Sequence, residues 1–337
     1  MRRILVVKLS ALGDLFHAIP VVHLLKAHYG CPVDWVTQPE YVSLLRCNPE
    51  VDRILAYPRH GGAGDWRSFV RALRAESYDL ALDLQGLAKS GIVLGLARAE
   101  RKVACPVSRE GAAWFANEKP VCRGRDRHAL DILLDTLAHV GVPQAPLAYP
   151  MDFPPSDPLP GSGPRLAIAP KSRWPAKDWP EERYAEVALR LRKRNGLDVL
   201  VLGGEKDAAC GDRICQAVGE RTFNLCGKSP LVALGGLLRG VDLLLCNDSG
   251  PMHFAAAVGT PLVALFGPTD PGKTGPRGPR CTVLRAPPGA KGYPDHRSYK
   301  NGDDSLMRSL DVDEVTRAVE SMLAKAPPVL LSPKTHP

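Results

Sequence analysis

Several features are missing from this 337-residue sequence. No run of about 18 apolar residues appears, the length that a membrane-spanning helix requires, and Met1 leads into an apolar strand in place of a signal sequence. Aromatic residues make up only 6% of the chain, and no base-reading or base-stacking motif is present, which disfavours nucleic acid as a partner. We therefore expect a soluble, cytoplasmic protein.

Motifs of common enzyme classes are also missing. The nine cysteines include no C-x-x-C pair, so we expect reduced thiols and no structural metal. The patterns G-x-G-x-x-G and G-x-S-x-G and the P-loop are absent, which disfavours dinucleotide enzymes, hydrolases with a nucleophile elbow and P-loop kinases.

Apolar runs and amphipathic stretches alternate in two halves on either side of a proline-rich stretch, Pro143 to Pro164. This pattern predicts two α/β domains, 1–158 and 159–326, each a parallel sheet wound with helices, and a disordered tail, 327–337. The strands expected are 4–8, 33–37, 53–57, 80–84, 165–169, 198–203, 242–246 and 262–266. The helices expected are 19–29, 66–75, 181–195, 231–239, 252–258 and 311–325, the last capped by Asp311 or Asp313.

Ligands of such sheets bind beyond the carboxyl ends of the strands, so two sheets facing each other would share a cleft. One candidate site follows strand 242–246, where Asp248 or Ser249 can cap a helix, Pro251 suits its first turn and Gly250 permits close approach. The exposed N–H groups of such a helix bind anions, which predicts a phosphate-bearing ligand. An ordinary strand-to-helix turn explains the same residues.

Cations gather in the loop 170–182, which follows strand 165–169 and holds Lys171, Arg173 and Lys177. Lys177 comes just before a helix start, where a cation is unfavourable unless an anion is present, so we expect a phosphate there. A solvated lysine is the alternative. After strand 198–203, Glu205 and Asp207 lie where open α/β sheets often hold ribose hydroxyls.

The loop after the first strand carries Gly13 and Asp14. From there the Asp14 carboxylate can act as a general base toward an acceptor hydroxyl, or it can cap the helix that begins near Leu15. His17 either packs on a helix face or touches substrate. The net charge is +8, and the stretch 98–127 holds eight basic against four acidic residues, which suits an anionic partner or a solvated basic face.

Three segments in order resemble the ADP-heptose:lipopolysaccharide heptosyltransferases, and the likeness runs nearly end to end. They are Lys8-x-Ser10-x-x-Gly13-Asp14-x-x-His17-x-x-Pro20, Lys177-x-Trp179-Pro180, and Asn247-Asp248-Ser249-Gly250-Pro251-Met252-His253 continuing to Phe266-Gly267-Pro268-Thr269-Asp270-Pro271. The stretch Asp83-Leu84-Gln85-Gly86-Leu87-Ala88-Lys89-Ser90 is similar to members that add the first heptose to Kdo.

The resemblance implies a GT-B fold and an inverting, metal-independent transfer of heptose from ADP-L-glycero-D-manno-heptose, with no cofactor. Asp14 would be the base, and Lys177 would stabilise the departing ADP. The donor-binding residues it implies are Ser172, Arg173, Glu205, Asp207, Ser229, Leu231, Asp248, Ser249, Gly250, Met252 and His253. The acceptor-binding residues it implies are Ser10, Gly13, His17, Gln85 and Lys89.

The acceptor implied is a Kdo or heptose hydroxyl of a lipid A–Kdo type inner core. The protein would act as a monomer in peripheral contact with the inner-membrane surface. The family also suggests that helix 311–325 packs back on the first domain. The segment 287–304 differs from the first-heptose enzymes, so the second-heptose step and other nucleotide sugars stay open. A nucleotide-sugar-binding protein without activity and an epimerase on the same fold are further alternatives.

Overall fold

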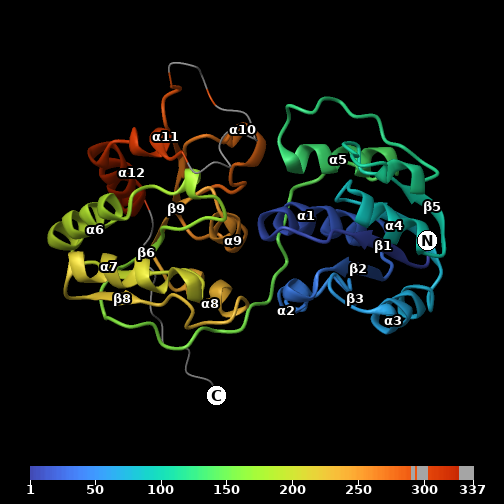
Figure 1. Ribbon diagram of the computed structural model, residues 1–337, viewed down its shortest axis with the longest axis horizontal. Helices are drawn as coiled ribbons and strands as arrows, with labels where there is room; N and C mark the ends of the chain where they lie inside the picture. Colours follow the sequence, from blue (N-terminus) through green and yellow to red (C-terminus); the bar gives the residue numbers. More distant parts are fainter. Residues whose placement is uncertain (290–292, 294–302, 326–337) are drawn as a thin grey trace. The chain divides into compact units, whose positions relative to one another are not determined.

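The computed structural model describes residues 1–289, 293 and 303–325. The predicted tail 327–337 and most of the divergent segment 287–304 lie outside these residues. The chain forms two compact units, Met1–Asp152 and Phe153–Pro337, which divide within the proline-rich stretch (Figure 1). Each unit is described by itself.

The first unit is a five-stranded parallel sheet with helices on both faces (Figure 1). Its strands are β1 (Ile4–Val7), β2 (Val33–Thr37), β3 (Arg53–Ala56), β4 (Tyr78–Asp83) and β5 (Ala99–Val103). Its helices are α1 (Leu12–Tyr29), η1 (Pro39–Tyr41), α2 (Val42–Leu45), α3 (Ala63–Leu73), α4 (Ala88–Leu96), η2 (Ala112–Phe115) and α5 (Ala129–His139). The strand order is β3-β2-β1-β4-β5, so the direction of winding reverses between β1 and β4.

The second unit is a six-stranded parallel sheet in the order β11-β10-β9-β6-β7-β8, whose winding reverses between β6 and β9. Its strands are β6 (Arg165–Ala169), β7 (Asp198–Val201), β8 (Thr222–Asn224), β9 (Leu243–Asn247), β10 (Leu262–Phe266) and β11 (Cys281–Arg285). Its helices are η3 (Pro175–Lys177), α6 (Glu181–Asn195), η4 (Glu205–Asp207), α7 (Ala208–Val218), α8 (Ala233–Arg239), α9 (Gly250–Val258), α10 (Pro271–Thr274), α11 (Ser305–Arg308) and α12 (Val312–Lys325).

Continuous apolar runs become the central strands because both faces of each sheet are covered. All four side chains of β1 are fully buried. Leu5 and Val7 pack in one cluster with Phe69 of α3 and Val93 of α4. Ile4 and Val6 point to the opposite face of the pleated strand, and α1 and α5 pack on each other in this unit.

In the second unit, α6, α7 and α12 share one core cluster with the sheet, while α8 and α9 pack together. Helix α12 contacts α6 and the strands β9, β10 and β11. The predicted cap is confirmed, because the Asp311 carboxylate accepts the N–H groups of Asp313 at 2.7 Å and Glu314 at 3.1 Å. Packing of this helix on the first domain stays a prediction.

One helix begins earlier than the spacing predicted. Helix α1 starts at Leu12, before the predicted stretch 19–29 and close to the start near Leu15 expected for a helix capped by Asp14, and Pro20 lies inside it. An interior proline removes a backbone hydrogen bond and costs about 3 kcal/mol or more. The side chains on either side of it, Ile19 and Val21, are fully buried, and this packing offsets the cost. The sequence reading also left unnamed the elements β5, β8, β11, α4, α5 and α7.

The chain after Asp152 belongs to the second unit because Phe153 packs into it. Its ring lies 4.9 Å from that of Phe254 on α9, and Arg239 stacks over it at 5.6 Å. A Cβ at Gly235 of α8 would meet the Phe153 ring at 2.2 Å, so only glycine admits this approach. The second unit therefore starts before the predicted boundary at 158/159.

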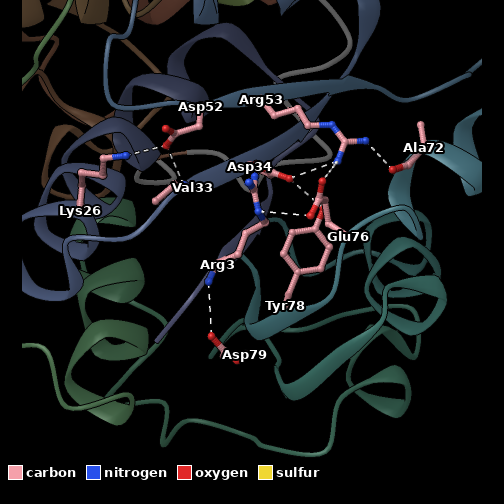
Figure 2. A network of polar contacts seen from close by, with 10 residues as sticks. All are labelled: Arg3, Lys26, Val33, Asp34, Asp52, Arg53, Ala72, Glu76, Tyr78 and Asp79. Atoms are coloured by element: carbon pink, nitrogen blue, oxygen red, sulfur yellow. Dashed lines mark hydrogen bonds and ion pairs between the residues drawn. The ribbon is translucent and has the colours of Figure 1, made fainter.

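A charged cluster joins four strands of the first sheet at their amino ends (Figure 2). Asp34 of β2 is fully buried and accepts hydrogen bonds from Arg3 at 2.6 Å and from the Tyr78 hydroxyl at 2.9 Å. The Arg53 guanidinium lies 3.6 Å from the same carboxylate. Burial raises the pKa of Asp34, and Tyr78, Arg3 and Arg53 act in the opposite direction. This cluster fixes strand positions at the edge opposite the carboxyl-end loops.

We predict that Tyr78→Phe lowers the free energy of unfolding of the first unit by about 2 kcal/mol, because a buried carboxylate loses a hydrogen bond. Scanning calorimetry at neutral pH measures the change. Burial, and then Asp34, raise the pKa of Tyr78 above its ordinary 10.0, so the wild type should lose stability as pH rises past that value and Tyr78→Phe should lose less.

Tyr57→Phe is the matched control. Tyr57 is also buried, and its hydroxyl makes no hydrogen bond to the described residues. Equal destabilisation by the two variants would show that ring packing, and not the bond to Asp34, sets the effect.

Candidate functional site

Two loops meet at the carboxyl edge of the first sheet, where its winding reverses. One follows β1, carries Ser10 and leads into the first turn of α1 with Gly13 and Asp14, and the other follows β4 and carries Gln85. Open α/β sheets bind ligands at such reversal points. All four residues are half-buried.

Asp14 lies in the first turn of α1, and its Oδ2 accepts the backbone N–H of Ala11 at 3.0 Å. The carboxylate therefore does cap the helix, one of the two roles that the sequence predicted. Asp65 makes the same contact on α3, where its Oδ2 accepts the Gly62 N–H at 2.9 Å. Capping alone thus does not distinguish Asp14, but its place at the winding reversal does.

Gln85 is bonded to the neighbouring loop. Its Oε1 accepts the N–H groups of Leu9 at 3.1 Å and of Ser10 at 3.0 Å. Lys89, the other β4-side residue expected to bind an acceptor, is half-buried on α4. A role of either residue in acceptor binding stays a prediction.

His17 is packed in the helical layer. Its side chain is buried on α1, and its ring lies 5.2 Å from that of His128 in an edge-on contact. His128 in turn caps α5 by accepting the Leu130 N–H. Packing is one of the two roles weighed for His17 from the sequence.

The basic stretch 98–127 is partly neutralised within the first unit. Arg127 donates to Asp135 at 2.6 Å, and Arg123 lies 3.8 Å from the same carboxylate. Arg101 makes two hydrogen bonds to Glu118. Arg109, Lys119 and Arg125 are exposed.

In the second unit, the end of β9 is joined to the loop after β6 by the buried side chain of Asn247. Its Nδ2 donates to the Pro170 carbonyl at 2.7 Å. Its Oδ1 accepts the Tyr184 hydroxyl at 2.7 Å and the Trp179 N–H at 3.2 Å. This one side chain fixes both loops at the second winding reversal.

Lys177 and Asp248 form an ion pair at this edge. The Lys177 ammonium lies 2.7 Å from Asp248 Oδ2, which also accepts the Thr269 hydroxyl at 2.7 Å. The two paired side chains are only 15% and 7% exposed, so water screens them weakly. The sequence predicted an external anion beside Lys177, whereas the fold provides an internal one, the Asp248 carboxylate.

The N-terminus of α9 lies beside this pair, and no side chain caps it. Ser249 occupies the N-cap position, but its hydroxyl donates to the Asn247 carbonyl at 3.3 Å. The Asp248 carboxylate instead binds the Lys177 ammonium and the Thr269 hydroxyl. Both capping predictions were thus wrong, since each side chain finds a different partner. Gly250 begins the helix and is half-buried.

The two α9 residues expected at the donor are buried. Met252 is fully buried and His253 is 8% exposed. Within the β6 loop, Ser172 donates its N–H to Asp178 at 2.8 Å, while Arg173 is exposed and stacks 5.7 Å from the Trp174 ring. Burial raises the pKa of Asp178, against the effect of Ser172 and Lys171.

The loops after β7 and β8 lie side by side, because the Gly227 N–H donates to the Gly203 carbonyl at 3.0 Å. Gly227 has φ of +70°, and a Cβ there would come within 2.8 Å of the Glu205 Cα, so glycine is required. Glu205 is exposed, and Asp207 accepts the Gly204 N–H at 2.8 Å. Ser229 is exposed on the next loop and Leu231 is half-buried just before α8. The residues predicted to contact ribose and adenine therefore lie on neighbouring loops, and the contacts themselves stay predictions.

The sequence motifs predict no separate role for Asn247, Thr269 or Asp178, although all three residues lie in or beside those motifs. Their partners come from other loops, which local patterns do not indicate. Within the described ranges, no helix has the length and apolar character that a bilayer crossing demands. Nor do the histidine, cysteine and carboxylate side chains of those ranges form a group of three or more suited to a metal ion.

Comparison with known proteins bears on the family and the fold. A family model described as "Glycosyltransferase family 9 (heptosyltransferase)" matches residues 66–299. Lipopolysaccharide heptosyltransferase 1 of Pseudomonas aeruginosa is 29% identical over 300 residues, covering 82% of this chain and 81% of the relative. Lipooligosaccharide heptosyltransferase 2 of Haemophilus influenzae is 31% identical over 311 residues, covering 84% and 88%.

A solved structure, that of Escherichia coli ADP-heptose LPS heptosyltransferase II, superposes with a TM-score of 0.81 at 25% identity, covering 96% of this chain and 99% of that one. The E. coli heptosyltransferase WaaC with ADP superposes with a TM-score of 0.79 at 24% identity, covering 95% and 99%, and supports the fold alone. Because the family model spans more than half of the chain, the protein belongs to glycosyltransferase family 9, the heptosyltransferases, and is a glycosyltransferase with the GT-B fold.

Proposed function

We propose that the protein transfers heptose from ADP-L-glycero-D-manno-heptose to a Kdo or heptose hydroxyl of the lipopolysaccharide inner core, with inversion at the anomeric carbon. One observation carries the proposal. The winding reversal of one sheet holds a carboxylate, and that of the other holds a lysine beside an uncapped helix N-terminus. The relatives named above are heptosyltransferases of lipopolysaccharide or lipooligosaccharide.

In the proposed reaction, Asp14 accepts the proton of the acceptor hydroxyl as that oxygen attacks the anomeric carbon. The new carbon–oxygen bond forms while the bond to the diphosphate breaks, and ADP leaves with the electron pair. Within the described residues, Asp14 Oδ1 receives no hydrogen bond, so we assign the proton to this oxygen. A single displacement of this kind inverts the anomeric centre without a covalent intermediate.

Negative charge grows on the departing ADP, and we assign its stabilisation to Lys177 and the N–H groups at the start of α9. An ammonium carries three donors, so Lys177 can hold a phosphate oxygen along with Asp248. The Thr269 hydroxyl offsets part of the Asp248 charge. Because these groups are fixed before the reaction, we propose that no divalent ion is required.

The remaining donor contacts are assigned to the neighbouring loops. Ser172 and Arg173 lie on the phosphate side, Asp207 and Glu205 on the ribose side, and Ser229 and Leu231 on the adenine side. We also propose a cytoplasmic monomer that meets its anionic acceptor at the membrane surface through the exposed cations of the stretch 98–127.

A screen of ADP-sugars by mass spectrometry, in the presence of EDTA, tests the donor and the acceptor together. Two acceptors are needed, lipid A–Kdo without heptose and the same molecule with one heptose. We expect one heptose to be added from ADP-heptose to one of the two, and which one it is decides between the first and the second step. Absence of product from both would contradict the proposal.

Replacing the base tests the mechanism. Asp14→Asn should lower kcat by about 100-fold or more, the usual contribution of a general base. ADP affinity, measured by calorimetry, should not change because the donor groups come from the other unit. Asp65→Asn is the matched control, since it makes the same change of charge at the corresponding cap of α3 and keeps an oxygen that can accept the Gly62 N–H. Equal activity of the two variants would reduce Asp14 to a cap.

Removing the cation tests the donor side. Lys177→Ala should lower kcat by about 100-fold or more, which corresponds to roughly 3 kcal/mol of lost transition-state stabilisation. Lys193→Ala, on the exposed face of α6, serves as the control. The double variant Lys177→Ala/Asp248→Asn avoids a buried uncompensated charge and should be equally impaired. Recovery of turnover in that double variant would show that Lys177 only neutralises Asp248.

A further inference from the structure

The hydrogen bonds of the Gln85 side chain join the two loops at the first winding reversal, the loop after β4 and the loop after β1. Gln85 comes from the chain after β4, and its Oε1 accepts the N–H groups of Leu9 at 3.1 Å and Ser10 at 3.0 Å. One carbonyl oxygen thus holds two consecutive amides of the loop that leads to Asp14.

Gln85 is itself held by a buried carboxylate. Asp83, the last residue of β4, is fully buried, and its Oδ1 accepts the N–H groups of Gln85 at 2.8 Å and Gly86 at 3.0 Å. Its Oδ2 accepts the Ser90 hydroxyl at 3.1 Å. Asp83 thereby fixes the backbone from which the Gln85 side chain extends.

The other side of the β1 loop is fixed by β2 and the residue after it. The Leu9 carbonyl accepts the Gln38 N–H at 3.2 Å and the Thr37 hydroxyl at 3.4 Å. The next amide along the row after Ser10 is that of Ala11, which donates to Asp14 Oδ2 at 3.0 Å. A continuous row of anchored amides therefore ends at the carboxylate.

We infer that Gln85, held by Asp83, is a positioning residue that orients Asp14 through the amides of Leu9 and Ser10. This inference rests on the proposed function, in which Asp14 is the base. It assigns the Gln85 oxygen to the protein and not to the acceptor. A positioning residue of this kind changes kcat, because a small displacement of a reacting group is enough to slow the reaction.

Variants of Gln85 that lack the Oε1 acceptor test this positioning role. Gln85→Met keeps the length of the side chain and removes the acceptor, so kcat should fall on the order of 10- to 100-fold while the acceptor KM stays unchanged. Gln85→Glu keeps an acceptor oxygen for the Leu9 and Ser10 amides, so their hydrogen exchange should stay slow in this variant. Gln216→Met, on the exposed face of α7, is the control. Hydrogen exchange at the Leu9 and Ser10 amides should accelerate in Gln85→Met alone.

A double-mutant cycle shows whether Gln85 acts through Asp14. In the Asp14→Asn background, Gln85→Met should cause no further loss of kcat, because coupled residues are not additive. Additive losses, or a raised acceptor KM with kcat unchanged, would overturn the inference and leave the proposed function standing. If Asp14→Asn retained full activity, Asp14 would not be the base, and the proposed mechanism would fail together with the inference. Gln85→Asn, shorter by one methylene, gives the same comparison if Gln85→Met does not fold.

Discussion

A side-chain carboxamide bridges the winding reversal in each sheet, and the geometry of the loops there depends on it. In the first unit Gln85 reaches from the end of β4 to the loop after β1. In the second unit Asn247 reaches from the end of β9 to Pro170 after β6. In each sheet the chain winds in opposite directions from these two strands, so the loops that follow them run apart. The carboxamide hydrogen bonds hold these two loops together.

An amide suits this place because it donates and accepts hydrogen bonds without carrying a charge. The same edges hold charged groups whose electrostatic environment matters, Asp14 in one unit and Lys177 with Asp248 in the other. A charged bridge would shift the ionisation of such neighbours. The buried carboxylates of the first unit, Asp83 and Asp34, each accept hydrogen bonds from several donors.

Local patterns predicted the apolar strands and amphipathic helices well. Strands β6 and β10 and helix α6 have the predicted bounds, because continuous apolar runs and a regular amphipathic spacing mark them. The predicted stretch 19–29 left out the first turns of α1, because the side chains from Leu15 to Val22 are all buried and so show no amphipathic spacing. Short strands such as β8, whose side chains are all half-buried, lack a clear signal.

The site was predicted less completely, because its contacts join residues far apart in the sequence. Lys177 was singled out for a missing anion, and its partner Asp248 lies 71 residues further along the chain. Gln85 was noted through a resemblance, and its bond to Leu9 spans 76 residues. The motifs thus located the residues, while the strand order determined which of them meet.

The Asp34 cluster (Figure 2) lies at the amino ends of the strands of the first sheet, whereas Asp14 follows the carboxyl end of β1. Stability and chemistry are thereby assigned to opposite ends of the same strands. A change in this cluster would leave the residues at the carboxyl ends of the strands in place, in a protein that unfolds sooner on warming. Activity that is lost only at raised temperature is therefore the expected effect of substitutions at these positions.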